Sequence, residues 1–335
     1  MPRNHYTGEV VTVVIDELSP LVQDGVMSYA ALTFTKLSAR FSSLRQAPLG
    51  DRRAPHKPLL ILLMLGRYQH GDFAPLLFED AQTKLKQLLL DFGPSSVGAP
   101  NILDPFWRLQ NVGVWEVEDA VGSRIAETVV PPHTGVLTSR HARGNFVKDI
   151  SAALQGQPLY IPRLARELLA AHFPQTLHED ICQAVGLEVY QPAEELPADQ
   201  IRSREADFRP RIIRAYEHRC AVTGWDLRIG HADAGLEAAH IKWHTAGGPS
   251  VETNGIALNC LHHKLFDLGA FTLSVGNELP RILVSREVHG SDSSRQMLAD
   301  LHNKPIRPPQ DPAWLPDPAF VQWHQEQVFK GPPRA

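Results

Sequence analysis

The feature that most constrains this chain is the order of residues between 236 and 267. EAAHI occupies positions 237–241, NGI occupies 254–256, and CLHHKLFD occupies 260–267. The apolar run that ends at His240 predicts a strand leading into a loop, and the last segment predicts a helix. On that helix His263 and Asp267 are four positions apart, so they share one face. Each motif alone would be weak, but their combined order is specific.

These residue types suit hydrolysis of a phosphodiester bond. The reaction needs a base to activate water and a cation to stabilise charge on the phosphoryl and leaving oxygens. An imidazole titrates near neutrality, so we assign His240 as the general base. His263 and Asp267 are predicted to bind one divalent metal ion, such as Mg²⁺ or Mn²⁺. Asn254 is expected to fix the loop beside His240 through its side-chain amide.

The same stretch resembles the HNH (ββα-metal) endonuclease family over residues 208–274, including YEHRCAVTG at 216–224. The resemblance implies a two-stranded ribbon and a helix around one metal, a nucleic-acid substrate, and catalytic roles for His240, Asn254 and His263. Many family members place a metal-binding Asp or His directly before the base, whereas this chain has Ala239.

The position of Ala239 leaves the metal ligands open to two interpretations. Either the ion has fewer protein ligands and more water, or His262 or Glu237 supplies the missing bond. The predicted ligand set is therefore His263, Asp267 and His262. For Asp267 the alternative is a cap at the end of the helix.

Composition limits the remaining options. The chain has 335 residues, which predicts two domains, and a formal net charge of -4, so DNA contacts must come from local basic patches. Arginines gather at 202–219, and basic residues gather at 45–57. The amino terminus lacks a secretory signal pattern, so we expect a cytoplasmic protein without membrane association. The three cysteines do not complete a zinc site, and Cys220 and Cys260 are predicted to be small buried residues.

The predicted fold class is α+β, with a mainly helical amino-terminal domain joined by a linker to a ββα-metal nuclease domain. Helices are expected at 26–45, 57–68, 81–92, 162–173 and 175–185, with 57–68 apolar enough to be central. Residues 104–117 predict an aromatic, hairpin-like segment. The predicted boundaries are an extension at 1–25, a reader domain at 26–186, a linker at 187–206, the nuclease at 207–275 and a proline-rich arm at 276–335 that packs on the nuclease.

A second resemblance lies in the amino-terminal half. APHKPLL at 54–60, PFWRL at 105–109 and GNF at 144–146 resemble the sulfur-binding domain of phosphorothioate-dependent, type IV-like restriction endonucleases. The resemblance implies recognition of double-stranded DNA in which sulfur replaces a non-bridging phosphate oxygen, with Pro105 in an apolar cup for the sulfur. It departs at Asp104, where an aromatic residue is common. The predicted DNA-binding residues are Arg52, Arg53, His56, Lys57, Pro105, Arg108, Gly144 and Asn145.

Taken together, these patterns predict a metal-dependent DNA endonuclease that recognises phosphorothioate-modified DNA, a restriction or defence enzyme. One alternative is an HNH restriction endonuclease that reads another DNA modification or a sequence. The other is a modified-DNA reader that does not cleave, which Ala239 suggests. The sequence leaves open whether two copies form a homodimer.

Overall fold

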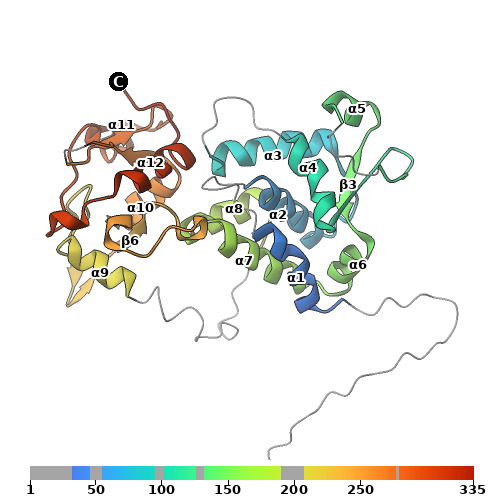
Figure 1. The fold of residues 1–335 in the computed structure, drawn as a ribbon, viewed down its shortest axis with the longest axis horizontal. Coiled ribbons are helices and arrows are strands. Elements are labelled where there is room, and N and C mark those ends of the chain that lie inside the picture. Colours follow the sequence, from blue (N-terminus) through green and yellow to red (C-terminus); the bar gives the residue numbers. More distant parts are fainter. Residues whose placement is uncertain (1–31, 46–54, 95–101, 126–131, 190–206, 277–278) are drawn as a thin grey trace, which may run out of the picture. The chain divides into compact units, whose positions relative to one another are not determined.

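The computed structural model describes residues 32–45, 55–94, 102–125, 132–189, 207–276 and 279–335 (Figure 1). Two hydrophobic clusters organise these residues, one centred on the helices before residue 190 and the other on the strands and helices after residue 207. This arrangement of a helical part and a part with small sheets confirms the predicted α+β class. None of the helices within these ranges is long and apolar enough to cross a membrane.

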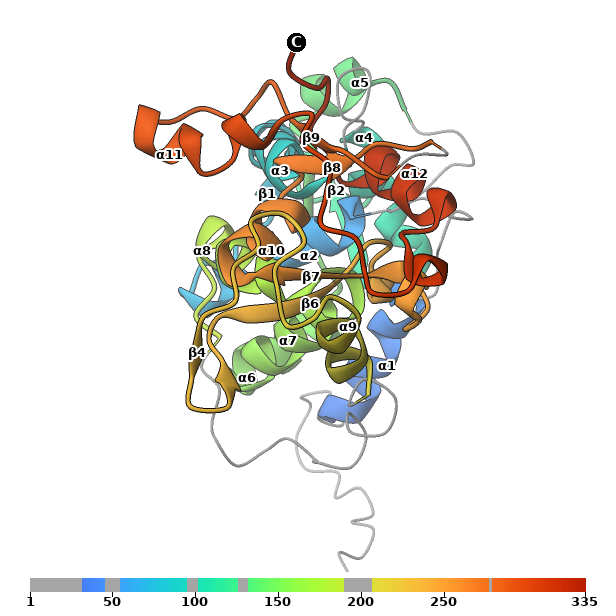
Figure 2. The ribbon, with the colours of Figure 1, turned by 90° about the vertical axis from the view of Figure 1, so that its left-hand side faces the viewer.

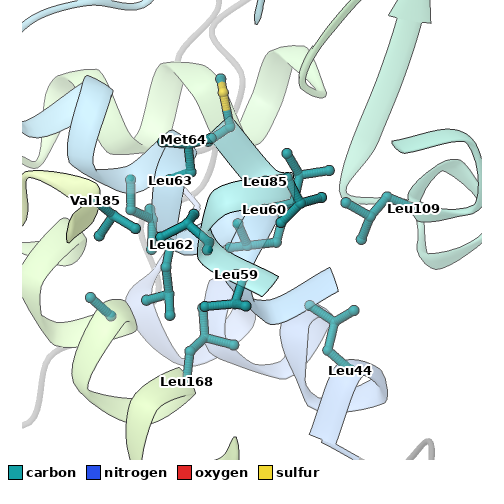
Figure 3. Packing of buried hydrophobic residues seen from close by; sticks show 14 of the residues in the cluster. Leu44, Leu59, Leu60, Leu62, Leu63, Met64, Leu85, Leu109, Leu168 and Val185 are labelled. Atoms are coloured by element: carbon teal, nitrogen blue, oxygen red, sulfur yellow. The ribbon is translucent and has the colours of Figure 1, made fainter. Parts of the chain in front are cut away.

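Helix α2 (His56–Gln69) is the centre of the amino-terminal cluster, as predicted for residues 57–68. Its residues from Pro58 to Gly66 are all buried, and Figure 3 shows several of them packed among Leu85, Leu168 and Val185 of other helices. The helices of this part are α1 (Phe34–Arg45), α3 (Phe78–Phe92), α4 (Leu103–Arg108), α5 (Thr134–Ser139), α6 (Lys148–Gly156), α7 (Tyr160–His172) and α8 (His178–Val185).

A small antiparallel sheet with strand order β1-β3-β2 completes this part. Its strands are β1 (Leu76–Leu77), β2 (Trp115–Glu118) and β3 (Arg143–Phe146). Trp115 faces β3 at a position where Gly144 has no side chain, since a Cβ there would lie 2.2 Å from the indole. Glycine at 144 is thus required for the indole to pack against the strand.

The carboxyl-terminal part contains a two-stranded antiparallel ribbon followed by a helix (Figure 2). Strand β6 (Leu236–His240) pairs with β7 (Gly255–Asn259), and α10 (Cys260–Asp267) follows directly, capped by the side chain of Asn259. Helix α9 (Phe208–Ala215) packs on the ribbon. A second ribbon, β4 (Arg228–Ile229) and β5 (Ala232–Asp233), precedes β6. The strand, loop and helix predicted around His240 and His263 are therefore present.

The proline-rich arm contributes β9 (Ile282–Val284), which forms a third ribbon with β8 (Phe271–Leu273) from the end of the predicted nuclease segment, and then α11 (Asp292–Gln296) and α12 (Pro318–Gln327). Ile282, Val284 and Val321 join the nuclease-side cluster, as expected for an arm packing on that core. Trp323 and Val328 instead belong to the cluster around α2, which extends the prediction. Residues 32–335 form one compact unit.

The helix predicted over 26–45 is present from Phe34 to Arg45, and residues 26–31 lie outside the described ranges. Two predictions of local structure were wrong. The segment predicted as hairpin-like is helical from Leu103 to Val112 (α4 and a short 3-10 turn), and only Trp115–Glu118 is a strand. Pro105 is compatible with α4 because the first turn of a helix has no intrahelical acceptors for its N–H groups. Cys260 is exposed, whereas Cys220 is buried as predicted.

Candidate functional site

His240 is the last residue of β6, so its ring lies where the strand gives way to a loop. The imidazole stacks on Phe208 with ring centroids 3.8 Å apart and an interplanar angle of 11°. Its Nε2 lies 3.2 Å from Ser250 Oγ. Burial lowers the pKa of His240 to about 4, and the nearby His244 and His263 add to this effect. The ring is therefore neutral at physiological pH and keeps a lone pair for accepting a proton.

Asn254 ties down the loop that follows His240. Its side chain is fully buried; Oδ1 accepts a hydrogen bond from Lys242 N at 2.8 Å, and Nδ2 donates to Lys242 O at 3.0 Å. Nδ2 also lies 2.9 Å from Pro249 O. The backbone of Asn254 accepts a further hydrogen bond from Ile241 N. One amide thus links both ends of the loop between 241 and 250.

His263 lies between two carboxylates. Its Nδ1 is 2.7 Å from Glu237 Oε2, and its Nε2 is 3.3 Å from Asp267 Oδ2. Burial opposes the charged imidazole, but the carboxylates of Asp267 and Glu237 together raise the pKa of His263. The hydrogen bond from His263 lowers the pKa of Glu237 against the effect of burial. Thr176 donates its hydroxyl to Asp267 Oδ2.

This donor set fits a divalent cation. Histidines that bind metal ions characteristically donate their second ring N–H to a carboxylate, which is the role that Glu237 can play for Nδ1 of His263. Nε2 and the carboxylate of Asp267 then lie side by side as ligand atoms. Within the described ranges no three His, Cys, Asp or Glu side chains converge as a metal site, so water and substrate oxygens would complete the coordination.

His262 has hydrogen-bond partners of its own, and Ala239 is a buried residue of the ribbon. His262 is buried, with Nδ1 2.8 Å from Asn259 Oδ1 and Nε2 3.1 Å from Met297 O, so a metal ion would have to displace one of these contacts. Ala239 is fully buried opposite Ile256 in the ribbon. Of the two groups considered as substitutes for a ligand at 239, only Glu237 reaches His263.

The residues predicted to contact DNA fall into two places. His56 and Lys57, at the start of α2, meet α4: Lys57 Nζ donates to Arg108 O at 3.3 Å, and Arg108 Nε lies 3.2 Å from Asp104 Oδ1. Burial lowers the pKa of His56, while Asp104 acts in the opposite direction. We call His56, Lys57, Asp104 and Arg108 the α2–α4 polar cluster.

Asn145 and Gly144 lie near the other end of α2. Asn145 Oδ1 accepts hydrogen bonds from Tyr68 Oη and from Phe146 N, both at 2.8 Å, and Nδ2 donates to Phe73 O at 3.0 Å. Gly144 is in the central strand of its sheet. His56 and Tyr68 are twelve positions apart on one helix, a rise of about 18 Å. The predicted residues therefore do not form one continuous set.

Pro105, Arg52 and Arg53 complete the predicted reader residues. Pro105 is buried in α4 together with Phe106 and Trp107, so its ring is part of the core in this conformation. Arg52 and Arg53 lie outside the described residues.

The arginines of α9 were predicted as part of a basic patch, but two of the three have structural partners. Arg211 donates to Glu252 Oε1 at 2.8 Å and to Ser250 O at 2.7 Å, and Arg209 donates to Leu236 O at 2.8 Å. Sequence reasoning identified neither Ser250 nor Phe208 as a neighbour of His240. Glu237, three positions before His240, was found as an alternative ligand from its carboxylate alone.

Two family models match the chain. The model of the ScoMcrA-like DNA sulfur-binding domain matches residues 34–190, and the HNH endonuclease model matches residues 220–274. Both resemblances predicted from sequence motifs are thereby confirmed. No protein with a curated description matches the chain.

Several solved structures are similar to part of this chain. The sulfur-binding domain of ScoMcrA complexed with phosphorothioated DNA has 21% identity and a TM-score of 0.37, covering 45% of this chain and 94% of that chain. The corresponding SprMcrA complex has 22% identity and a TM-score of 0.36, covering 47% and 98%. The type IV phosphorothioation-dependent restriction endonuclease ScoMcrA has 21% identity and a TM-score of 0.36, covering 46% of this chain and only 35% of that longer chain.

Proposed function

We propose that this chain, which contains a ScoMcrA-like DNA sulfur-binding domain followed by an HNH endonuclease domain, is a phosphorothioate-dependent restriction endonuclease of the type IV kind. It binds double-stranded DNA carrying a phosphorothioate and hydrolyses phosphodiester bonds nearby, as a defence enzyme of the cytoplasm. The observation that carries the proposal is the presence of both domains, reader before nuclease, in one chain.

In the proposed reaction His240 is the general base. Its ring is neutral at physiological pH because burial lowers its pKa to about 4. The neutral ring accepts a proton from water as the water oxygen bonds to phosphorus. Asn254 holds the loop beside the base, through the three hydrogen bonds of its amide.

His263 and Asp267 are the proposed ligands of a divalent cation, with Glu237 orienting His263. Such an ion supplies stabilisation of negative charge on the phosphoryl and leaving oxygens. His262 is retained from the sequence prediction only as a weaker candidate, because both its ring nitrogens already face protein oxygens.

The α2–α4 polar cluster is the proposed phosphate-binding part of the reader. Lys57 and Arg108 provide two positive charges and Asp104 one negative charge, so the cluster favours an anion. Sulfur is larger and less strongly hydrated than oxygen, so an apolar surface favours it over phosphate oxygen. Pro105 remains the proposed sulfur contact, and its buried ring would have to become accessible to DNA.

The test compares matched plasmids with and without phosphorothioate, incubated with the full chain and Mg²⁺ or Mn²⁺. We expect cleavage of the modified plasmid only, and loss of cleavage with a chelator. In the variant His240→Ala we expect a rate at least about 10²-fold lower, since a general base contributes at least that factor, while binding of modified DNA is retained.

The outcomes separate the proposal from its alternatives. Equal cleavage of both plasmids would leave a nuclease but remove the phosphorothioate specificity. Preferential binding of modified DNA without cleavage by the wild-type chain would identify a reader with an inactive nuclease. Ala239 is fully buried in the ribbon, so packing explains an alanine at this position. Its presence therefore does not require that the nuclease has lost catalysis.

A further inference from the structure

The ring of His240 is held from two directions. Phe208 lies parallel to it, 3.8 Å away between centroids, which fixes the plane of the imidazole. Ser250 Oγ lies 3.2 Å from Nε2, which fixes how the ring is turned within that plane. Together these contacts determine which nitrogen faces away from Ser250 and is available to a substrate.

The backbone around these contacts is specialised for them. Gly255 is the partner of His240 in the register of β6 and β7. A Cβ at Gly255 would lie 2.2 Å from Ile212 Cδ1 and 3.0 Å from Phe208 Cζ. The glycine therefore lets α9 approach the ribbon closely enough for Phe208 to reach the imidazole.

Ser250 is also held in place by its neighbours. Arg211, one turn after Phe208 on α9, donates to Ser250 O at 2.7 Å and to Glu252 Oε1 at 2.8 Å. Asn254 donates to Pro249 O at 2.9 Å. The loop that carries the Ser250 hydroxyl is thus held by hydrogen bonds at positions 249, 250 and 252. These contacts fix the position of the hydroxyl beside the ring.

The tautomer of His240 decides whether the ring can act as a base. A neutral imidazole has one N–H and one lone pair. If Nε2 carries the hydrogen and donates it to Ser250 Oγ, the lone pair is on Nδ1. If Ser250 donates to Nε2, Nδ1 carries the hydrogen and cannot accept another proton. In the described part of the chain Nδ1 has no hydrogen-bond partner.

We propose that Ser250 is a positioning residue that accepts a hydrogen bond from Nε2–H of His240 and thereby makes Nδ1 the atom that takes the proton from water. This inference rests on the proposed nuclease function. As the water oxygen bonds to phosphorus, its proton passes to Nδ1, and the bond between phosphorus and the leaving ester oxygen breaks with its electron pair on that oxygen. Solvent water protonates the leaving oxygen, and the imidazolium returns the Nδ1 proton to solvent.

The first test reads the tautomer without any cleavage. ¹⁵N NMR of the full chain labelled at histidine distinguishes the two protonation sites, and the variant His240→Gln identifies the signals of His240. We expect hydrogen on Nε2 in the wild type and in Ser250→Thr, which keeps a hydroxyl. In Ser250→Ala we expect a mixture of tautomers. Hydrogen on Nδ1 in the wild type, or an unchanged tautomer in Ser250→Ala, would overturn the proposal.

The second test uses single-turnover cleavage of phosphorothioate DNA at saturating protein. Ser250→Ala should lower the rate constant about tenfold, the worth of one neutral hydrogen bond in an equilibrium, with DNA affinity unchanged. Ser250→Thr should restore most of the rate. The matched control is Ser274→Ala, which removes an acceptor for Arg281 N at 2.9 Å in the same part of the chain and should cleave normally.

These two tests separate the inference from the proposed function. A wild-type chain that does not cleave modified DNA would refute the nuclease function, while the NMR result would still decide the role of Ser250. Equal losses of rate in Ser250→Ala and Ser250→Thr, or a loss in Ser250→Ala that is confined to DNA affinity, would overturn the positioning role.

Discussion

Replacing Asn254 by alanine should loosen the loop beside the candidate base more than it affects the rest of the fold. The substitution removes three hydrogen bonds, to Lys242 N, Lys242 O and Pro249 O. Pro249 is exposed, so its carbonyl can bind water instead. The N–H and C=O of the half-buried Lys242 each lose a hydrogen bond to Asn254, and such a loss costs about 1–3 kcal/mol per group.

Adding the two groups of Lys242 gives a loss of about 2–6 kcal/mol, which is a large part of a typical stability of about 5–15 kcal/mol. The suitable control is Asn259→Ala, because the half-buried Asn259 caps α10: its Oδ1 accepts a hydrogen bond from His262 N at 2.8 Å and also lies 2.8 Å from His262 Nδ1. Loss of such a cap costs about 1 kcal/mol. Asn254→Ala should therefore be clearly the more destabilising of the two.

Hydrogen exchange measured by mass spectrometry gives a local readout for Asn254→Ala. The amide of Lys242, which donates to Asn254 Oδ1, should exchange much faster in the variant, and the cleavage rate should fall while DNA affinity is kept. Urea unfolding followed in parallel should show the larger loss for Asn254→Ala. The reasoning is wrong if the amide of Lys242 stays protected, or if Asn259→Ala destabilises the chain equally.

Three further predictions concern the metal pair and the loop. Because the carboxylates raise the pKa of His263 against the effect of burial and a metal ligand must be deprotonated, metal affinity should fall as the pH drops through that raised value. Glu237→Gln should move this fall to lower pH, which calorimetry at several pH values would show or exclude. His263→Ala should abolish metal binding and Asp267→Asn should weaken it; unaltered affinity in both would refute the ligand set. Gly248→Ala should unfold the loop, because its Cβ would lie 1.9 Å from a backbone oxygen. Gly247→Ala would meet no atom within 4 Å, but its φ is +78°. In thermal unfolding it should therefore cost only about 1–2 kcal/mol of stability.

Local sequence patterns were sufficient for the ribbon and helix around His240 and His263. A strand ending at His240 and a helix with His263 and Asp267 four positions apart depend on short-range periodicity, which the sequence displays directly. The contact between Ser250 and His240 depends on a loop that is closed by Asn254 and held by Arg211 of helix α9. No periodicity relates these positions, so their proximity could not be read before the fold was known.

The reader residues show a different limit of sequence reasoning. His56, Lys57 and Arg108 come together because α4 packs against the start of α2, and the motifs containing them lie within the residues matched by the sulfur-binding family model. Asn145 belongs to the same family resemblance, but its amide is used by Tyr68 and Phe73 at the far end of α2. A motif identifies residues that occur together in a family without showing whether each contacts the ligand or supports the fold.

The arginines of α9 show why charge composition alone is a weak guide to a DNA-binding surface. Arg211 donates a hydrogen bond to the loop of Ser250, and Arg209 donates one to a carbonyl of β6. Both guanidinium groups are therefore already hydrogen-bonded within the protein. A charge already paired with Glu252 contributes less to attracting phosphate, because the carboxylate cancels its field at distances beyond the pair. With a net charge of -4, the chain has little general attraction for DNA. Selection of a modified site must then depend on short-range contacts of the reader, and we propose that the α2–α4 polar cluster supplies the charged part of them.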